Sequence, residues 1–147
     1  MKTIAFWTSD LTIHGGTQRV VSTLANALND IYGYQIYIYT LSQHNKKFVY
    51  NISDNINLVN LNLDYKLLNL RKIIKKVNNL NSKYNVTTIL GIGCYFSVLL
   101  PFIKCKRRIA CEHSDYYKPS RKFRLIRKIA YKKVEAIISL TEHDKKY

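Results

Sequence analysis

Short apolar runs alternate along this chain with longer stretches whose apolar residues recur every three or four positions. A short run rich in β-branched and aromatic residues predicts a strand, whereas the longer spacing predicts an amphipathic helix. The expected strands cover residues 3–8, 34–41, 56–61, 86–90, 107–111 and 136–140. This alternation indicates an α/β fold: a doubly wound, mostly parallel sheet with helices on both faces. In such sheets ligands bind beyond the carboxyl ends of the strands.

The same spacing predicts which helix faces are buried. The first helix follows the strand at 3–8 and is expected to bury Val20, Val21, Leu24 and Leu28. A second helix is expected to be capped by Asp64 and to bury Leu67, Leu70, Ile74 and Val77, with Leu68 and Ile73 widening that face. A glycine turn at 91–93 precedes a third helix from about residue 95, and residues 42–55 form a polar loop.

Two glycines, Gly15 and Gly16, separate the first strand from its helix. Glycine allows the backbone to approach a ligand closely or to adopt a positive φ. Thr17 is expected to be the N-cap, and the N–H groups beyond it form a site for an anion such as a phosphate. The spacing matches neither the dinucleotide-binding fingerprint nor the P-loop. Gly15, Gly16 and Thr17 are therefore candidate substrate-binding residues on a phosphate- or sugar-facing loop.

A family resemblance begins at residues 14–28, which read HGGTQRVVSTLANAL. This string resembles the opening of the family 4 glycosyltransferases, which typically read Gly-Gly-Ala-Glu-Arg-Val-Val before a helix rich in Leu and Ala. The matching positions are Gly15, Gly16, Arg19, Val20, Val21, Leu24, Ala25 and Leu28. Thr17 and Gln18 depart from the pattern, and Gln18 removes a negative charge that would oppose an anion. The resemblance implies the two-domain B-type glycosyltransferase fold, with residues 1–147 as the amino-terminal, acceptor-side domain.

A second family-like string, Glu112-His113-Ser114, directly follows the fifth expected strand. Many family members carry Glu-His at this point, and the resemblance implies that His113 faces the reacting sugar. His113 is thus the catalytic candidate, with Glu112 and Ser114 as substrate-binding candidates. Two interpretations of Glu112 stay open. It orients the imidazole or binds an acceptor hydroxyl, or it only pairs with Arg107 or Arg108.

The last residues, 137–147, read IISLTEHDKKY and are similar to the strand and helix start before the linker of these enzymes. We therefore expect a fragment that lacks the carboxy-terminal, donor-binding domain and that alone transfers nothing at a useful rate. The family's donor domain carries two glutamates along one helix, and no such helix is expected here. The resemblance implies retaining transfer from a nucleotide-sugar donor to a glycan or lipid-linked acceptor, in bacterial surface polysaccharide or glycolipid synthesis. It implies no metal and no cofactor.

The chain is strongly basic, with 24 Lys and Arg against 9 Asp and Glu and a net charge of +15. Twelve of these cations lie within residues 104–133. Residues 120–133 predict a basic amphipathic helix with Phe123, Ile126, Ile129 and Ala130 on one side. Such a helix can lie on an anionic membrane. The candidate membrane contacts are Arg121, Lys122, Phe123, Arg124, Arg127 and Lys128. The alternative is a packed helix with a solvated basic face.

Two other functions fit parts of the sequence. A nucleic-acid-binding domain suits the pI of about 9.8, but the basic residues form no recognisable RNA-binding motif or helix-turn-helix, which disfavours a nucleic-acid partner. The second alternative is that the chain is half of a sugar-nucleotide epimerase-like enzyme. The Gly-Gly-Thr-Gln-Arg string disfavours this alternative.

The sequence predicts a cytoplasmic protein that can contact the inner leaflet of the plasma membrane. The start of the chain lacks the pattern of a secretion signal, and the longest apolar segment, 89–103, is shorter than the ~20 residues of a membrane span. Cys94, Cys105 and Cys111 are odd in number and lack metal-ligand spacing, which is typical of reduced thiols in a cytosolic protein.

Overall fold

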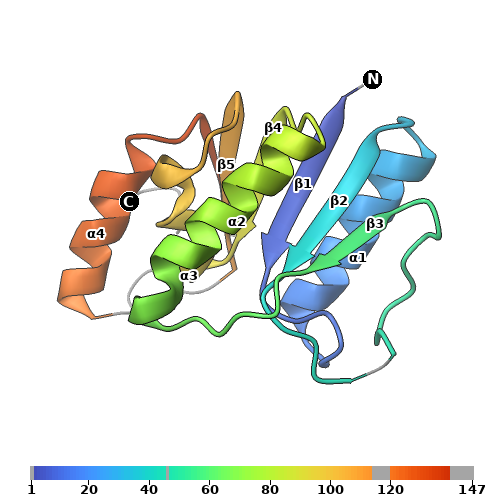
Figure 1. Ribbon diagram of the computed structural model, residues 1–147, viewed down its shortest axis with the longest axis horizontal. Helices are drawn as coiled ribbons and strands as arrows, with labels where there is room; N and C mark the ends of the chain where they lie inside the picture. Colours follow the sequence, from blue (N-terminus) through green and yellow to red (C-terminus); the bar gives the residue numbers. More distant parts are fainter. Residues whose placement is uncertain (1, 46, 114–119, 140–147) are drawn as a thin grey trace.

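The computed structural model describes residues 2–45, 47–113 and 120–139. Within these residues the chain forms a six-stranded, all-parallel sheet and four α-helices (Figure 1). The strands are β1 (Thr3–Thr8), β2 (Gln35–Thr40), β3 (Asn57–Asn60), β4 (Thr88–Ile92), β5 (Arg107–Glu112) and β6 (Ala136–Ser139). The helices are α1 (Gly16–Asp30), α2 (Leu70–Lys83), α3 (Cys94–Ser97) and α4 (Arg121–Tyr131), with 3-10 turns at Leu67–Asn69 and Leu100–Phe102. The expected strand bounds are within two residues of these.

The strands lie in the order β3-β2-β1-β4-β5-β6, which is a Rossmann-like arrangement. From β1 the chain proceeds through β2 to β3 at one edge, and from β4 it proceeds through β5 to β6 at the other. The direction therefore reverses between β1 and β4, which pair in register from Ile4–Thr88 to Trp7–Gly91. The carboxyl ends of these two strands form a topological switch point, where open α/β sheets bind ligands.

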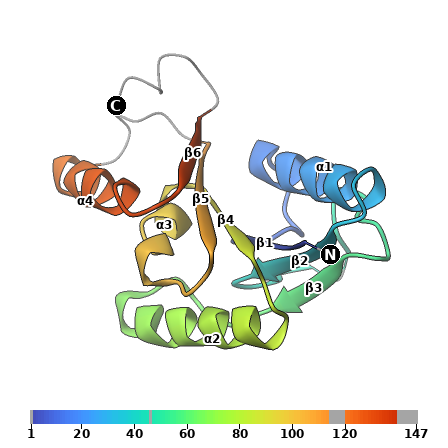
Figure 2. The same cartoon turned by 90° about the horizontal axis from the view of Figure 1, so that it is seen from above.

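Helices cover both faces of the sheet, which confirms the expected doubly wound fold. Figure 2 shows α1 on one side and α2, α3 and α4 on the other. Side chains alternate along β1, so that Ile4 and Phe6 join the core under α1, whereas Ala5 and Trp7 join the core under the other helices. The ring of Trp7 meets Phe96 of α3 edge-on, with 5.3 Å between the ring centroids. All of β1 is buried, as expected for a central parallel strand.

The buried stripe of α1 differs from the expected one. Val21 and Ala25 are fully buried, but Val20 is exposed, so its predicted core position is wrong. Two polar residues, Gln18 and Ser22, complete the buried stripe instead. The buried Ser22 hydroxyl donates a hydrogen bond to the carbonyl oxygen of Gln18, one turn earlier in the helix, at 2.9 Å. The helical period of the apolar residues predicts which side of α1 is buried, but it does not predict which residue lies at the centre of that side.

The start of α2 also differs from the expectation. Asp64 does not cap the helix; its carboxylate pairs with the Lys66 ammonium at 3.1 Å on the surface. Lys66 has an extended backbone, and no residue of the 3-10 turn that follows it is buried. Leu67 and Leu68 are 84% and 91% exposed rather than buried. The buried side of α2 begins with Ile73.

The four residues expected on one side of α4 lie in different environments. Phe123 and Ala130 pack against the core, as in the alternative of a packed helix. Ile126 and Ile129 were expected on the same face, but both are exposed. Arg127 takes their place, with only 3% of its side chain exposed.

Candidate functional site

The first turn of α1 lies at the switch point, directly beyond the loop that follows β1. Gly15 is the N-cap residue, and among the described residues no side chain caps the helix. Thr17 lies within the first turn, so its predicted capping role is wrong. The first turn also contains no acidic residue. An uncapped helix start without negative charge presents open N–H groups and a positive dipole end to an anion.

The two glycines serve different purposes. Gly15 has an extended backbone with φ 176°, and neither glycine adopts the left-handed conformation that favours glycine. A Cβ atom on Gly15 would lie 2.3 Å from Oε1 of Gln18, whereas a Cβ atom on Gly16 would meet nothing within 4 Å. Gly15 is thus required by the close approach of the Gln18 side chain. Gly16 leaves open space beside the helix start.

This difference predicts opposite effects of two matched substitutions. We expect Gly15→Ala to lower the free energy of unfolding by about 1–3 kcal/mol, because the added methyl group displaces the buried Gln18 amide. Gly16→Ala should leave the free energy of unfolding unchanged or raise it by up to about 1 kcal/mol, because alanine lowers the conformational entropy of the unfolded chain. Urea unfolding of both variants measures the difference. Equal losses would show that Gln18 does not constrain Gly15.

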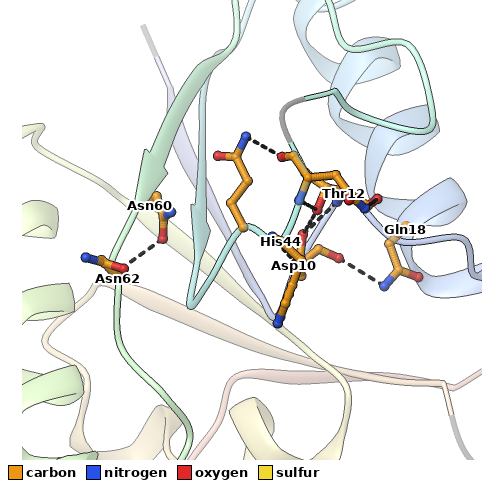
Figure 3. A network of polar contacts seen from close by, with 8 residues as sticks. Asp10, Thr12, Gln18, His44, Asn60 and Asn62 are labelled. Atoms are coloured by element: carbon orange, nitrogen blue, oxygen red, sulfur yellow. Dashed lines mark hydrogen bonds and ion pairs between the residues drawn. The ribbon is translucent and has the colours of Figure 1, made fainter.

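The loop after β1 is organised by the buried carboxylate of Asp10, which the sequence analysis did not single out (Figure 3). Its Oδ1 accepts hydrogen bonds from the backbone N–H and the hydroxyl of Thr12, at 2.7 and 2.6 Å. Its Oδ2 accepts from the backbone N–H of His44 at 2.9 Å and lies 2.5 Å from Nδ1 of the same residue. Burial alone would raise the pKa of Asp10, but the hydrogen bonds from Thr12 and His44 lower it to about 2. Asp10 is therefore ionised at neutral pH.

Gln18 connects this carboxylate loop to the helix start. Its buried side-chain amide donates a hydrogen bond to the carbonyl oxygen of Asp10 at 3.0 Å. An ionised glutamate has no hydrogen to donate, so it would place its charge against that carbonyl. Gln18 therefore has a structural role in this chain at the position where it departs from the family pattern.

A second set of hydrogen bonds joins the loop after β1 to the loop after β2. The backbone N–H of Asn45 donates to the Thr12 hydroxyl at 3.0 Å, and the Asn45 side-chain amide donates to the Thr12 carbonyl at 2.9 Å. Most of the His44 side chain remains exposed. With Nδ1 directed at Asp10, the outer Nε2 can form a hydrogen bond with a ligand.

The sequence contains only a weak indication that Asp10 and His44 lie together. Asp10 follows the first strand and His44 follows the second, and both loops lie at the ligand-binding edge of a parallel sheet. The two residues are 34 positions apart, so no local motif connects them.

Glu112, at the end of β5, has a buried partner that the sequence analysis did not predict. Its Oε2 accepts a hydrogen bond from Nη2 of Arg127 at 2.8 Å, and both side chains are almost fully buried. Arg108 instead pairs with Glu135 at 2.6 Å, so the predicted pairing of Glu112 with Arg108 is wrong. The Glu112–Arg127 pair joins β5 to α4 directly before His113. Its carboxylate thus connects two elements at this corner of the fold.

His113 lies half-buried at the end of β5, as expected for a residue beyond the carboxyl end of a strand. Its Nε2 is buried and makes no hydrogen bond with the residues that the structure describes. Burial lowers the pKa of His113 below its usual value of 6.5, so the imidazole is neutral at physiological pH. Ser114, the neighbouring substrate-binding candidate, lies outside the described residues.

The glycine loop and His113 follow strands that are separated only by β4. Neighbouring strands are about 4.8 Å apart, so the ends of β1 and β5 lie roughly 10 Å from one another. Between them, the chain leaves β4 through Gly93, whose φ of 86° favours glycine. The three strand ends therefore form one continuous rim.

Comparisons with known proteins add no family assignment. No model of a protein family matches the chain, and no curated protein matches it.

The described residues contain no metal centre, since no three His, Cys, Asp or Glu side chains in 2–45, 47–113 and 120–139 come together. The three cysteines are thiols, and Cys94 and Cys111 are buried. Burial, and to a lesser extent the neighbouring Glu112 carboxylate, raises the pKa of Cys111 to about 12, which makes this thiol unreactive at neutral pH.

The predicted membrane contacts on α4 separate into three groups. Arg121, Lys122 and Lys128 are exposed and remain candidates. Arg127 is buried against Glu112, so its predicted membrane contact is wrong. Phe123 and Arg124 are half-buried, and Phe123 packs on the core.

Proposed function

We propose that this chain is the amino-terminal, acceptor-side domain of a retaining glycosyltransferase of the family that it resembles. The enzyme takes a sugar from a nucleotide-sugar donor and transfers it to a glycan or lipid-linked acceptor in the cytoplasm. A second domain holds most of the donor. The reaction needs no metal or cofactor from this domain.

The observation that carries the proposal is the uncapped start of α1 at the switch point of the sheet. Its N–H groups suit the diphosphate of a nucleotide sugar, because an anion there gains from both the hydrogen bonds and the helix dipole. Gly16 leaves open space beside these groups, so a phosphate can approach the backbone. The hydrogen bonds from Asn45 to Thr12 and from Gln18 to Asp10 hold the loop before the helix in place.

In the proposed reaction, negative charge grows on the departing diphosphate as its bond to the sugar breaks. Fixed N–H donors stabilise that charge without having to reorganise during the reaction. His113 lies across the same rim as a neutral imidazole, which can donate one hydrogen bond and accept another. We assign to it the binding of a sugar hydroxyl next to the reacting carbon.

Replacement of His113 tests this assignment. In the complete protein, we expect His113→Ala to lower kcat by tenfold or more, a loss of about 1.4 kcal/mol or larger in transition-state stabilisation. The measurement is nucleoside diphosphate release from a panel of nucleotide sugars, with membrane extract as the source of acceptor. Circular dichroism checks that the fold is intact. Wild-type turnover in this variant would remove His113 from the site.

The pH profile and a conservative variant serve as controls. Since burial lowers the pKa of His113, the wild-type rate should not change with the ionisation of this group above pH 6.5. His113→Asn keeps a donor and an acceptor and should retain more activity than His113→Ala. If no sugar nucleotide is turned over by the complete protein, the proposed function is wrong.

A further inference from the structure

The outward face of α4 combines aliphatic side chains with cations. Leu125, Ile126 and Ile129 are each at least half exposed. Exposed cations surround them on the same helix and its end: Arg121, Lys122, Lys128, Lys132 and Lys133. Residues 121–133 contain no acidic residue. Neither the packing of the domain nor the proposed sugar site uses these side chains.

Beside this face, aromatic rings connect the core-packed side of α4 to the turn that precedes α2. The ring of Phe123 lies 5.4 Å from that of Tyr95, and Tyr95 lies 5.4 Å from Tyr65. The Tyr65 hydroxyl also donates a hydrogen bond to the Tyr95 carbonyl at 3.0 Å. Tyr65 precedes Leu67 and Leu68, two of the most exposed apolar residues of the described chain. Figures 1 and 2 both place α4 and the start of α2 on the same side of the molecule.

We propose that this apolar–cationic surface, formed by α4, Tyr95 and residues 65–68, docks the protein on an anionic lipid bilayer. The aliphatic side chains enter the boundary between headgroups and acyl chains, where their burial is favourable. The cations remain at the headgroups and attract acidic lipids. Tyr65 and Tyr95 each have an apolar ring and a polar hydroxyl, which suits the bilayer interface.

The chemistry of the surface favours lipid over other partners. Single-stranded nucleic acid is bound by cations together with aromatic rings on which bases stack. The exposed apolar residues among the cations of α4 are aliphatic, and the two exposed tyrosines of the surface lie outside that helix. Within the described parts of the chain, every helix is too short or too polar to cross a bilayer. The exposed aliphatic and cationic side chains of α4 suit a surface that lies on the membrane. This inference stands whether or not the chain transfers a sugar.

Vesicle co-sedimentation tests the docking directly. The complete protein is mixed with vesicles of phosphatidylglycerol and phosphatidylcholine, or of phosphatidylcholine alone, at 0.1 M salt. We expect at least tenfold tighter binding to the anionic vesicles, and weaker binding as salt rises. The pair Leu125→Ser and Ile129→Ser should weaken that binding tenfold or more. Lys122→Glu with Lys128→Glu should do the same, because it reverses two charges at the headgroups.

Two matched variants complete the design. Ile31→Ser with Tyr32→Ser removes two exposed apolar side chains just beyond the end of α1, and Lys104→Glu with Lys106→Glu reverses two exposed cations before β5. Both controls should bind vesicles like the wild type. Equal losses in the controls, or no binding to anionic vesicles, would overturn the proposal. Salt-sensitive RNA binding without vesicle binding, or dimerisation abolished by the Leu125 and Ile129 changes, would also overturn it.

Discussion

Replacing Arg127 with Met is expected to lower the free energy of unfolding by about 3–5 kcal/mol. The reason is that the buried Glu112 carboxylate would lose the guanidinium of Arg127, and removing one partner of a buried ion pair is costly. Urea unfolding monitored by circular dichroism measures the change. Because Glu112 precedes His113, we also expect the variant to lose activity in the complete protein.

Two further variants decide whether burial is the cause. The Arg108–Glu135 pair has a similar length but is more exposed, so Arg108→Met should cost at most about 1 kcal/mol. The double variant Glu112→Leu with Arg127→Met removes both charges and should recover most of the lost stability, since apolar replacements of a buried pair are often well tolerated. An Arg127→Met loss no larger than that of Arg108→Met would contradict this account of α4.

The second large effect is expected at Asp10. Asp10→Asn replaces an acceptor of four hydrogen bonds by a group with one acceptor oxygen, so the donors of either Thr12 or His44 lose their partner. We expect a loss of about 2–4 kcal/mol at pH 7. Urea unfolding at several pH values provides the measurement.

The pH dependence of that difference has a definite sign. The folded pKa of Asp10 is about 2, below its usual value of 3.8, so the ionised form stabilises the native state. This contribution, about 2 kcal/mol, is fully present above pH 3.8 and is lost as the pH falls through 2. The gap between wild type and Asp10→Asn should therefore narrow between pH 4 and pH 2. A gap that stays constant over this range would show that the Asp10 charge does not stabilise the fold.

The alternation of apolar runs and amphipathic stretches was sufficient to predict the fold class. Strand positions such as 3–8 are marked by local composition, and they were predicted within two residues. Local composition does not show which face of a helix is buried when that face includes a polar residue. Arg127 has the composition of a solvated cation, and its buried partner Glu112 lies 15 positions earlier. Val20 was misplaced for a related reason, because the polar residues Gln18 and Ser22 occupy the buried stripe of α1.

The candidate site was only partly predictable. Gly15, Gly16 and His113 were identified by a string resemblance and by their position after strands, and the structure places all three beyond carboxyl strand ends. Glycine is favoured at position 15 by a close contact with the Gln18 side chain, and this contact exists only in the folded loop. Asp10 and His44 meet only because β1 and β2 pair in parallel, so their loops emerge at the same edge. Such long-range contacts carry no signature in a single sequence.

Hydrogen–deuterium exchange of the complete protein with a bound sugar nucleotide tests the central claim most directly. A donor that the enzyme turns over should slow exchange in residues 9–18, where its diphosphate meets the open N–H groups of α1, and leave residues 70–83 of α2 unchanged. Slowed exchange around α2 with none in residues 9–18 would contradict a phosphate site at the start of α1.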